Sequence, residues 1–283
     1  MSTLRELLDW GRTALALAGV PDAGLDAWYL MEYVFEMDRA HYFLREEEKA
    51  DPQQEERYRD FIVQRSSRVP LQHLTHQAWF MGLEFYVDGR VLVPRQDTEI
   101  LVEEAVKRLG RGQKVLDMCT GSGCILLSIL KFMPDCQGTG VDISEAALEV
   151  ARMNGKRLNI PAVFFKSDLF EQIDGYYDMI VSNPPYIPTS VIGSLEDEVR
   201  RFDPALALDG GEDGLDFYRR LIGASRDYLS PGGWLLLEIG HDQREAVLRM
   251  MEKAGYKELQ AVSDLAGHDR VVMGQKDRRN EDV

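Results

Sequence analysis

The spacing of apolar residues predicts helices at the start of the chain. Leu4 and Leu8 belong to an apolar stripe with helical spacing, and Gly19 marks the expected end of this first helix. Two later stretches repeat the pattern, and each begins at an aspartate, Asp22 and Asp51, that we expect to cap its helix. Because this part carries no chemical motif, we predict a small helical bundle for packing or docking.

The pattern changes at "QAWFMGLEFYVDGRVLVP", where aromatic and β-branched residues gather on both sides of Asp88-Gly89. An Asp-Gly pair between two such runs is a common signal for a tight turn between antiparallel strands. We therefore predict a β-hairpin over about residues 79–93, which joins the helical part to the rest of the chain.

From about residue 95, strand patterns alternate with helix patterns. Apolar runs such as "KVLDMC", "GVDIS", "DMIVS" and "GWLLLEIG" are separated by amphipathic stretches with helical spacing. This alternation predicts an α/β fold with a doubly wound, Rossmann-like, mostly parallel sheet. The last two strand patterns are expected to form an antiparallel edge.

Composition and charge exclude several classes of function. The net charge is −15 over 283 residues, whereas nucleic-acid-binding proteins usually carry a basic face. No apolar run approaches the roughly 20 residues that cross a bilayer, and the acidic first helix is unlike a targeting signal. The three cysteines lack metal-ligand spacing and favour a reducing compartment. We expect a cytoplasmic protein with no metal, no membrane and no direct nucleic-acid partner.

The first strand-to-helix turn, "DMCTGSGC", is the strongest candidate for a ligand site. Parallel sheets bind ligands outside the carboxyl ends of their strands, and Gly121 and Gly123 let the backbone approach a ligand closely. The turn is no dinucleotide fingerprint, because Leu126 stands where that motif has its third glycine. The residues expected to line the ligand are Cys119, Thr120, Gly121, Ser122 and Gly123.

Acids at two further strand ends indicate which ligand this is. Asp142 ends the second strand about 20 residues after the glycines, where a carboxylate can accept both hydroxyls of a ribose, and Ile143 follows it. A ribose acid without a pyrophosphate motif indicates a nucleoside, of which S-adenosylmethionine is the common case. Asp168 and Leu169 end the third strand and are expected to flank an adenine, with a helix-capping role as the alternative for Asp168.

The tetrapeptide Asn183-Pro184-Pro185-Tyr186 follows the fourth strand and should reach the same edge of the sheet. A planar NH2 group is a poor nucleophile because its lone pair is delocalised, so methylating it requires a site that holds both N–H bonds. The carbonyls of Asn183 and Pro184 can accept them, the prolines fix φ, and the Tyr186 ring can stack on the flat group. We expect the placement of this nitrogen against the methyl group of a sulfonium to contribute more to the rate than the hydrogen bonds themselves.

The order "DMCTGSG", "GVDIS", "SDLF", "SNPPYI" resembles class I S-adenosylmethionine-dependent methyltransferases. NPPY-type motifs occur in enzymes that methylate planar amino nitrogens of DNA, ribosomal RNA or protein glutamine. Four flanking stretches narrow the resemblance to the PrmC/HemK family, the protein-(glutamine-N5) methyltransferases of peptide-chain release factors. These stretches are residues 68–87, 91–103, 202–222 and 264–272.

The resemblance implies that the chain methylates the glutamine amide in the Gly-Gly-Gln loop of release factors. It places the NPPY residues on that amide and the three strand ends on S-adenosylmethionine, and it puts Arg95 and Glu99 near the substrate. The implied domains are an N-terminal helical docking domain (1–75), a hairpin linker (76–94), a methyltransferase domain (95–276) and a charged tail (277–283).

Two other classes of function are considered. A nucleic-acid amino methyltransferase would share the NPPY motif, but the acidic charge weighs against it. A scaffold that binds S-adenosylmethionine and docks a translation factor would not need an amide-binding tetrapeptide.

Overall fold

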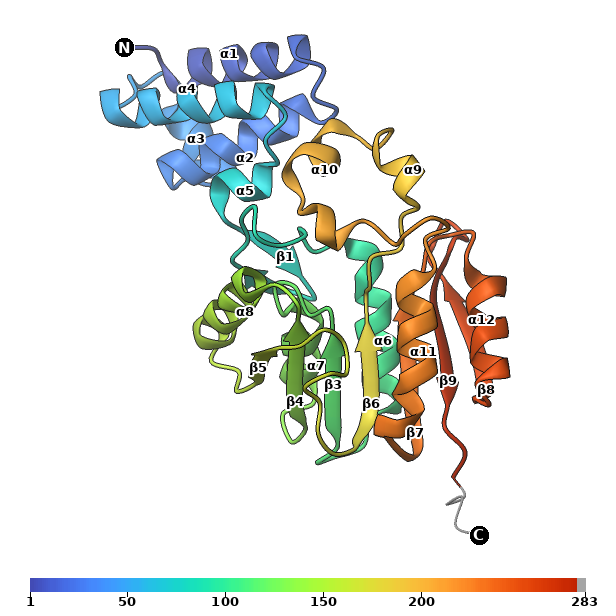
Figure 1. Cartoon of the computed structure of the whole chain (residues 1–283). Helices are drawn as coiled ribbons and strands as arrows, with labels where there is room; N and C mark the ends of the chain where they lie inside the picture. Colours follow the sequence, from blue (N-terminus) through green and yellow to red (C-terminus); the bar gives the residue numbers. More distant parts are fainter. Residues whose placement is uncertain (279–283) are drawn as a thin grey trace. The chain divides into compact units, whose positions relative to one another are not determined.

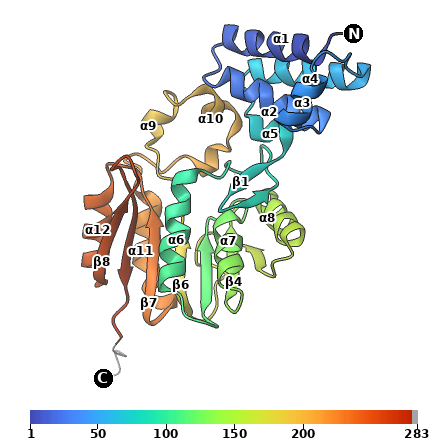
Figure 2. The same ribbon diagram turned by 180° about the vertical axis from the view of Figure 1, so that it is seen from behind.

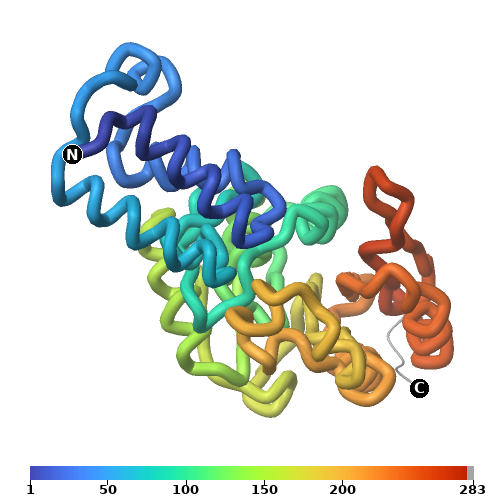
Figure 3. The backbone as a smooth tube through the Cα atoms, turned by 90° about the horizontal axis from the view of Figure 1, so that it is seen from above, coloured from blue at the N-terminus to red at the C-terminus, as the bar shows by residue number. Residues whose placement is uncertain are grey.

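The computed structural model describes residues 1–278, and these form two compact units (Figure 1). The first unit contains residues 1–77 and 196–202, and the second contains residues 78–195 and 203 onward. The predicted tail, 277–283, lies mostly outside the described residues. The chain can be followed by its colour through both units in Figure 3.

The first unit is helical, as the apolar stripe predicts. Asp51 accepts hydrogen bonds from the backbone N–H groups of Gln53 and Gln54, which confirms it as an N-cap. Asp22 stands at the N-cap position of its helix, as predicted, but its ψ of 41° is not extended and its side chain makes no capping hydrogen bond. The helices of this unit are α1 (Leu4–Leu17), α2 (Ala23–Phe35), α3 (Arg39–Arg45), α4 (Pro52–Ser66), α5 (Leu71–Thr75) and α10 (Asp197–Phe202).

Helix α10 belongs to the helical unit although it lies about 120 residues further along the chain. The prediction had placed this segment in the methyltransferase domain. Arg65, whose side chain is buried, bonds through Nε to Asp26 Oδ2 at 2.6 Å and through Nη2 to Glu198 Oε1 at 2.8 Å. A long-range ion pair of this kind cannot be read from local spacing.

The second unit is built on a seven-stranded sheet with the strand order β5-β4-β3-β6-β7-β9-β8. Strands β5 to β7 in this order are parallel, β9 runs antiparallel to β7, and β8 runs antiparallel to β9, so the predicted antiparallel edge is confirmed. The strands are β3 (Lys114–Met118), β4 (Gln137–Asp142), β5 (Val163–Lys166), β6 (Tyr177–Ser182), β7 (Leu229–Glu238), β8 (Lys257–Ser263) and β9 (Asp269–Gln275).

Helices cover both faces of this sheet (Figures 1 and 2). On one face, α6 and α7 bury Leu101, Val102 and Ile129 in one apolar cluster, and on the other, α11 and α12 bury Leu221 and Val247 in a second. This two-layer burial explains why the central strands are apolar along nearly their whole length. The helices are α6 (Glu99–Arg108), α7 (Cys124–Phe132), α8 (Glu145–Leu158), α9 (Thr189–Ile192), α11 (Asp216–Tyr228) and α12 (Arg244–Lys253), with single turns η1 (Gln96–Thr98) and η2 (Ala205–Ala207).

The hairpin is shorter than predicted, and its turn lies elsewhere. Strands β1 (Ala78–Phe80) and β2 (Leu83–Phe85) pair antiparallel around Met81-Gly82, whose φ angles are 51° and 72°. Two residues with positive φ match the twist of a two-residue hairpin. The predicted hairpin turn at Asp88-Gly89 is therefore wrong: the chain turns there, with the Val91 N–H donating to the Asp88 carbonyl at 3.1 Å, but β1 and β2 do not pair around it. After β2 the chain packs Val87 and Val91 among residues of α8 instead of forming a longer strand.

Candidate functional site

A pocket opens at the carboxyl ends of β3, β4 and β6, at the point where the order of the strands across the sheet reverses. Strand β3 pairs with β4 on one side and with β6 on the other, so the loops that follow them diverge and leave room for a ligand. The predicted residues that line the pocket are Cys119, Thr120, Gly121, Ser122, Asp142, Ile143, Asp168, Leu169, Asn183, Pro185 and Arg95. Gly123, Pro184, Tyr186 and Glu99 do not line it.

A buried acid, Asp117 of β3, stabilises the turn after that strand. Thr120 Oγ donates to Asp117 Oδ2 at 2.6 Å, and burial raises the pKa of Asp117 to about 7. Cys119 has a φ of 58°, in the left-handed region that favours glycine. Burial, and then the nearby Asp142, raises the pKa of the Cys119 thiol, so it stays protonated at neutral pH.

Asp142 at the end of β4 presents its carboxylate to the pocket. Its Oδ2 accepts the Gly121 N–H at 3.0 Å, and its Oδ1 accepts the Ser144 N–H at 2.9 Å. Each carboxylate oxygen can accept more than one hydrogen bond, so both retain capacity for hydroxyl donors. Burial raises the pKa of Asp142, while the hydrogen bonds from Ser144 and Gly121 lower it.

The third strand end also reaches the pocket. Asp168 Oδ1 pairs with Arg220 Nη2 of α11 at 2.7 Å, so part of its acceptor capacity is used by an arginine that the sequence did not single out. Leu169 is buried and has a φ of 48°. Ser167 Oγ donates to the Leu169 carbonyl at 2.6 Å, which holds this wall in place.

The NPPY segment follows β6 and lies beside the turn after β3. This turn, residues 119–123, is called the cofactor turn because the sequence predicts that it lines the cofactor. Ser182 Oγ donates to the Met118 carbonyl at 2.7 Å and so ties the end of β6 to the end of β3. The next residue, Asn183, donates from Nδ2 to Thr98 Oγ1 at 3.3 Å, which leaves its Oδ1 free of this contact. Tyr186 packs against the apolar cluster under α11, and burial raises its pKa to about 12.

Arg95 and Glu99 have different surroundings. Arg95 lines the pocket and bonds from Nη2 to Asp203 Oδ2 at 2.8 Å. Glu99 begins α6, and its Oε1 accepts the Met81 N–H of the hairpin turn at 2.5 Å. The geometry thus gives Glu99 a structural contact, and Arg95 alone of the two faces the pocket.

Sequence reasoning missed a buried acid behind Asn183. Glu238 is the last residue of β7, and Leu237 before it pairs with Ser182 of β6. Glu238 and Asn183 therefore follow paired residues of adjacent strands and lie next to each other. Burial raises the pKa of Glu238 to about 7, while hydrogen bonding from Thr98 and Asn183 lowers it. An acid ending an apolar strand was the signal used for Asp142, and it would also have found this residue.

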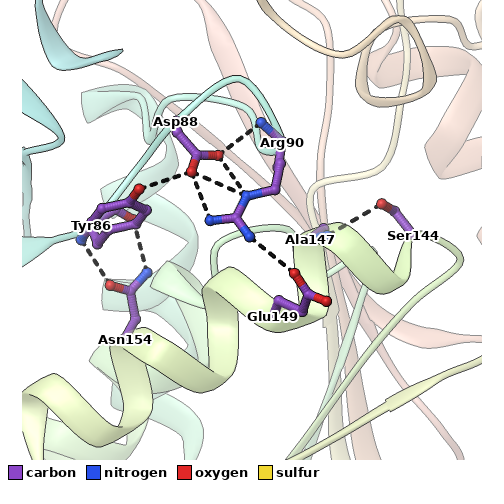
Figure 4. Close-up of polar contacts among 7 residues, drawn as sticks. All are labelled: Tyr86, Asp88, Arg90, Ser144, Ala147, Glu149 and Asn154. Carbon is purple, nitrogen blue, oxygen red and sulfur yellow. Dashed lines mark hydrogen bonds and ion pairs between the residues drawn. The ribbon is translucent and has the colours of Figure 1, made fainter. Parts of the chain in front are cut away.

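The segment after β2 contributes Arg90 to Leu92 to the pocket. Figure 4 shows how it is held: Asp88 accepts hydrogen bonds from the Arg90 guanidinium and the Tyr86 hydroxyl, and Arg90 also reaches Glu149 of α8. The Arg90 hydrogen bonds lower the pKa of Asp88 to about 2. The Asp88-Gly89 turn thus orients an arginine.

Asn154 of α8 bonds to Tyr86 in that segment (Figure 4), and it joins the segment to the cofactor turn through Ser122. Its Oδ1 accepts the Tyr86 N–H at 2.8 Å, and its Nδ2 donates to the Tyr86 carbonyl at 3.0 Å and to the Ser122 carbonyl at 2.9 Å. The side chain is fully buried. Sequence reasoning did not identify it, because an asparagine inside a helix carries no local signal.

Across residues 1–278, no group of histidine, cysteine and acidic side chains is arranged to hold a metal ion, and the three cysteines are free thiols. A search of the same residues finds no helix with the length and apolar character needed to cross a membrane.

Comparison with known proteins decides the family. The model of the PrmC N-terminal domain matches residues 6–75, and that of the methyltransferase small domain matches residues 95–193. A release factor glutamine methyltransferase from Geobacter sulfurreducens is 41% identical over 274 residues, which cover 96% of each chain. The chain belongs to the release factor glutamine methyltransferase family. A relative of the same name from Moorella thermoacetica is 39% identical over 97% of this chain and 99% of its own.

Solved structures agree on the fold. A methyltransferase from Pyrococcus furiosus superposes with a TM-score of 0.56 at 22% identity, over 76% of this chain and 99% of its own. A 16S rRNA N2 G1207 methyltransferase from T. Thermophilus, solved with AdoMet and guanosine, gives 0.52 at 20% identity, over 71% of this chain and 49% of its own. The predicted class I methyltransferase fold is confirmed.

Proposed function

We propose that this enzyme transfers a methyl group from S-adenosylmethionine to the side-chain amide nitrogen of the glutamine in the Gly-Gly-Gln loop of peptide-chain release factors. The observation that carries the proposal is the Asn183 amide, which lines the same pocket as the cofactor turn and is held through its Nδ2. The relatives carry the release-factor name over nearly their full length. Because release factors act at the ribosome, we place the enzyme in the cytoplasm.

The pocket has the donors and acceptors that S-adenosylmethionine needs. Asp142 would accept the ribose hydroxyls with the capacity that its two backbone contacts leave, and Leu169 would form an apolar wall for the adenine. Gly121, with a φ of 54°, has open space where a Cβ would stand, so the backbone can approach the cofactor. When bound, the cofactor supplies an electrophilic methyl group on its sulfonium.

The protein's own part in the chemistry is to hold a flat, weakly nucleophilic nitrogen still. Asn183 Oδ1 accepts one amide N–H, and the Pro184 carbonyl, fixed by the φ restriction of the two prolines, accepts the other. Placement of the nitrogen contributes most, because orientation can supply several kcal/mol of barrier lowering. The amide proton leaves after methyl transfer has made the nitrogen acidic, so the scheme requires no dedicated base.

Transfer of labelled methyl groups tests this function. Purified enzyme is incubated with methyl-labelled S-adenosylmethionine and, in separate reactions, a release factor, its Gly-Gly-Ala loop variant, and duplex DNA. We expect label on the unmodified release factor alone. Label on the alanine variant would refute glutamine as the acceptor, and label on DNA would favour a nucleic-acid amino methyltransferase instead.

A further inference from the structure

A buried amide stands behind the NPPY segment and has no role in the function described so far. Gln243 lies just before α12 and is 7% exposed. Its Nε2 donates to the Tyr186 carbonyl at 2.9 Å and to the Gly214 carbonyl at 3.2 Å. Its Oε1 accepts the Gly240 N–H at 2.9 Å and lies 3.2 Å from the Tyr218 hydroxyl, whose single proton is shared with the Glu238 carbonyl at 2.9 Å. Both N–H donors of this amide are therefore used, and its carbonyl oxygen is paired with a backbone N–H.

The backbone around this amide is packed too closely for side chains. A Cβ on Gly214 would lie 2.4 Å from the Tyr186 carbonyl oxygen and 2.8 Å from Gln243 Nε2, and one on Gly210 would lie 2.7 Å from Tyr186 Cα. The two glycines belong to the stretch 202–222 that carried part of the family resemblance. Their contacts show that this stretch forms the support on which the end of the tetrapeptide rests.

The tetrapeptide is thus fixed at both ends. At its start, Ser182 is bonded to β3, and at its end, Ile187 exchanges backbone hydrogen bonds with Leu208 and Gly210 at 3.0 and 2.8 Å. The Tyr186 carbonyl lies between these two anchors and is held by Gln243. Because Pro184 and Pro185 have restricted φ, a shift at Tyr186 would move the Pro184 carbonyl as well.

We propose that Gln243 is a positioning residue, whose amide fixes the Tyr186 carbonyl and thereby the acceptor carbonyls that hold the substrate nitrogen. This inference rests on the proposed function. Only a primary amide meets these contacts, since two carbonyls on one side require two N–H donors and the Gly240 N–H on the other requires an acceptor. Glutamate would set a carboxylate oxygen against two carbonyl oxygens, and methionine would leave both carbonyls and the Gly240 N–H without this partner.

The test compares Gln243→Glu and Gln243→Met with Gln137→Glu, a matched control at an exposed residue at the amino end of β4. At pH 8 we expect kcat to fall at least tenfold in both Gln243 variants, with the Kd of S-adenosylmethionine within about threefold of wild type. Relative to wild type at each pH, Gln243→Glu should recover as pH falls, because a protonated carboxyl can donate to one carbonyl. Gln243→Met should not recover.

The ratio to wild type removes the titration of nearby groups. These are Glu238, with a pKa of about 7, and the phenols of Tyr186 and Tyr218, whose pKa values are raised by burial. Asp242, the neighbour of Gln243 in the chain, is exposed and present in all variants. Wild-type kcat in both variants, or loss of cofactor affinity in step with kcat, would overturn the proposal.

Two further measurements keep the test decisive. If Gln243→Glu and Gln243→Met do not fold, Gln243→Asn keeps the primary amide but shortens its reach to the Tyr186 carbonyl by one methylene group. A lowered kcat with unchanged cofactor affinity then supports the proposal, and a wild-type kcat overturns it. Amide hydrogen exchange at Ile187 and Gly210 needs no substrate, so it stands even if the methylation assay refutes the proposed function. We expect faster exchange there in Gln243→Glu than in Gln137→Glu, and equal rates would overturn the proposal.

Discussion

Replacing Asn154 by leucine would remove three hydrogen bonds, two part-buried ones to the Tyr86 backbone and a buried one to the Ser122 carbonyl of the cofactor turn. Leucine has nearly the same volume, so the change deletes polar contacts and leaves no large cavity. Each lost bond costs about 1 kcal/mol, and more where the remaining partner stays unpaired, which gives about 3–5 kcal/mol for the three. For a unit of this size, that corresponds to a fall in Tm of roughly 6–20 °C.

Urea denaturation followed by circular dichroism measures this loss, with Met153→Leu as a control at the adjacent, exposed residue. The control should remain within about 0.5 kcal/mol of wild type. We also expect Asn154→Leu to weaken S-adenosylmethionine binding, because the Ser122 carbonyl loses its partner and the turn is less fixed. A free energy of unfolding within about 1 kcal/mol of wild type would refute the assignment of Asn154 as the link between the two segments.

Substitutions at Asn183 and at Glu238 separate cofactor binding from turnover. Asn183→Ala should keep the Kd for S-adenosylmethionine within a few-fold and lower kcat by about 100-fold, by analogy with the loss of one oriented polar contact in a transition state. If calorimetry instead shows that cofactor binding is lost, Asn183 is mainly a cofactor contact. Burial raises the pKa of Glu238 to about 7, so its charged form is lost as pH falls through 7. The charged carboxylate accepts hydrogen bonds from Thr98 and Asn183 and cannot donate one. We expect wild-type kcat to decline on this acid side and Glu238→Gln to be low and flat, and an unchanged acid limb in the variant would count against this role.

The sequence predicts those parts of the site that depend on neighbouring residues. The turn at Gly121, the acid at Asp142 and the tetrapeptide from Asn183 each follow an apolar strand, so their place at one sheet edge follows from the alternation of strands and helices. The hairpin turn was misplaced because the sequence has two glycines, Gly82 and Gly89, at which a turn could form. Gly82 takes the turn, while Asp88 is occupied by hydrogen bonds to Arg90 and Tyr86.

Contacts between distant residues could not be predicted in this way. Arg220 meets Asp168 across 52 residues, and Gln243 meets the Tyr186 carbonyl across 57. Neither pair has a local pattern, because each joins segments that are far apart in the sequence and meet only in the folded chain. Such supporting residues are found from the structure, whereas the residues predicted to touch ligands lie at strand ends that the pattern already marks.

Mass spectrometry of a release factor treated with this enzyme and S-adenosylmethionine tests the central claim most directly. After proteolysis, fragmentation of the peptide that contains the Gly-Gly-Gln sequence locates any added mass to a single residue. The account predicts the mass of one methyl substitution on the side chain of that glutamine, and a far smaller modified fraction with Asn183→Ala at the same early reaction time. An unmodified glutamine, or a methyl group on another residue of the factor, would contradict it.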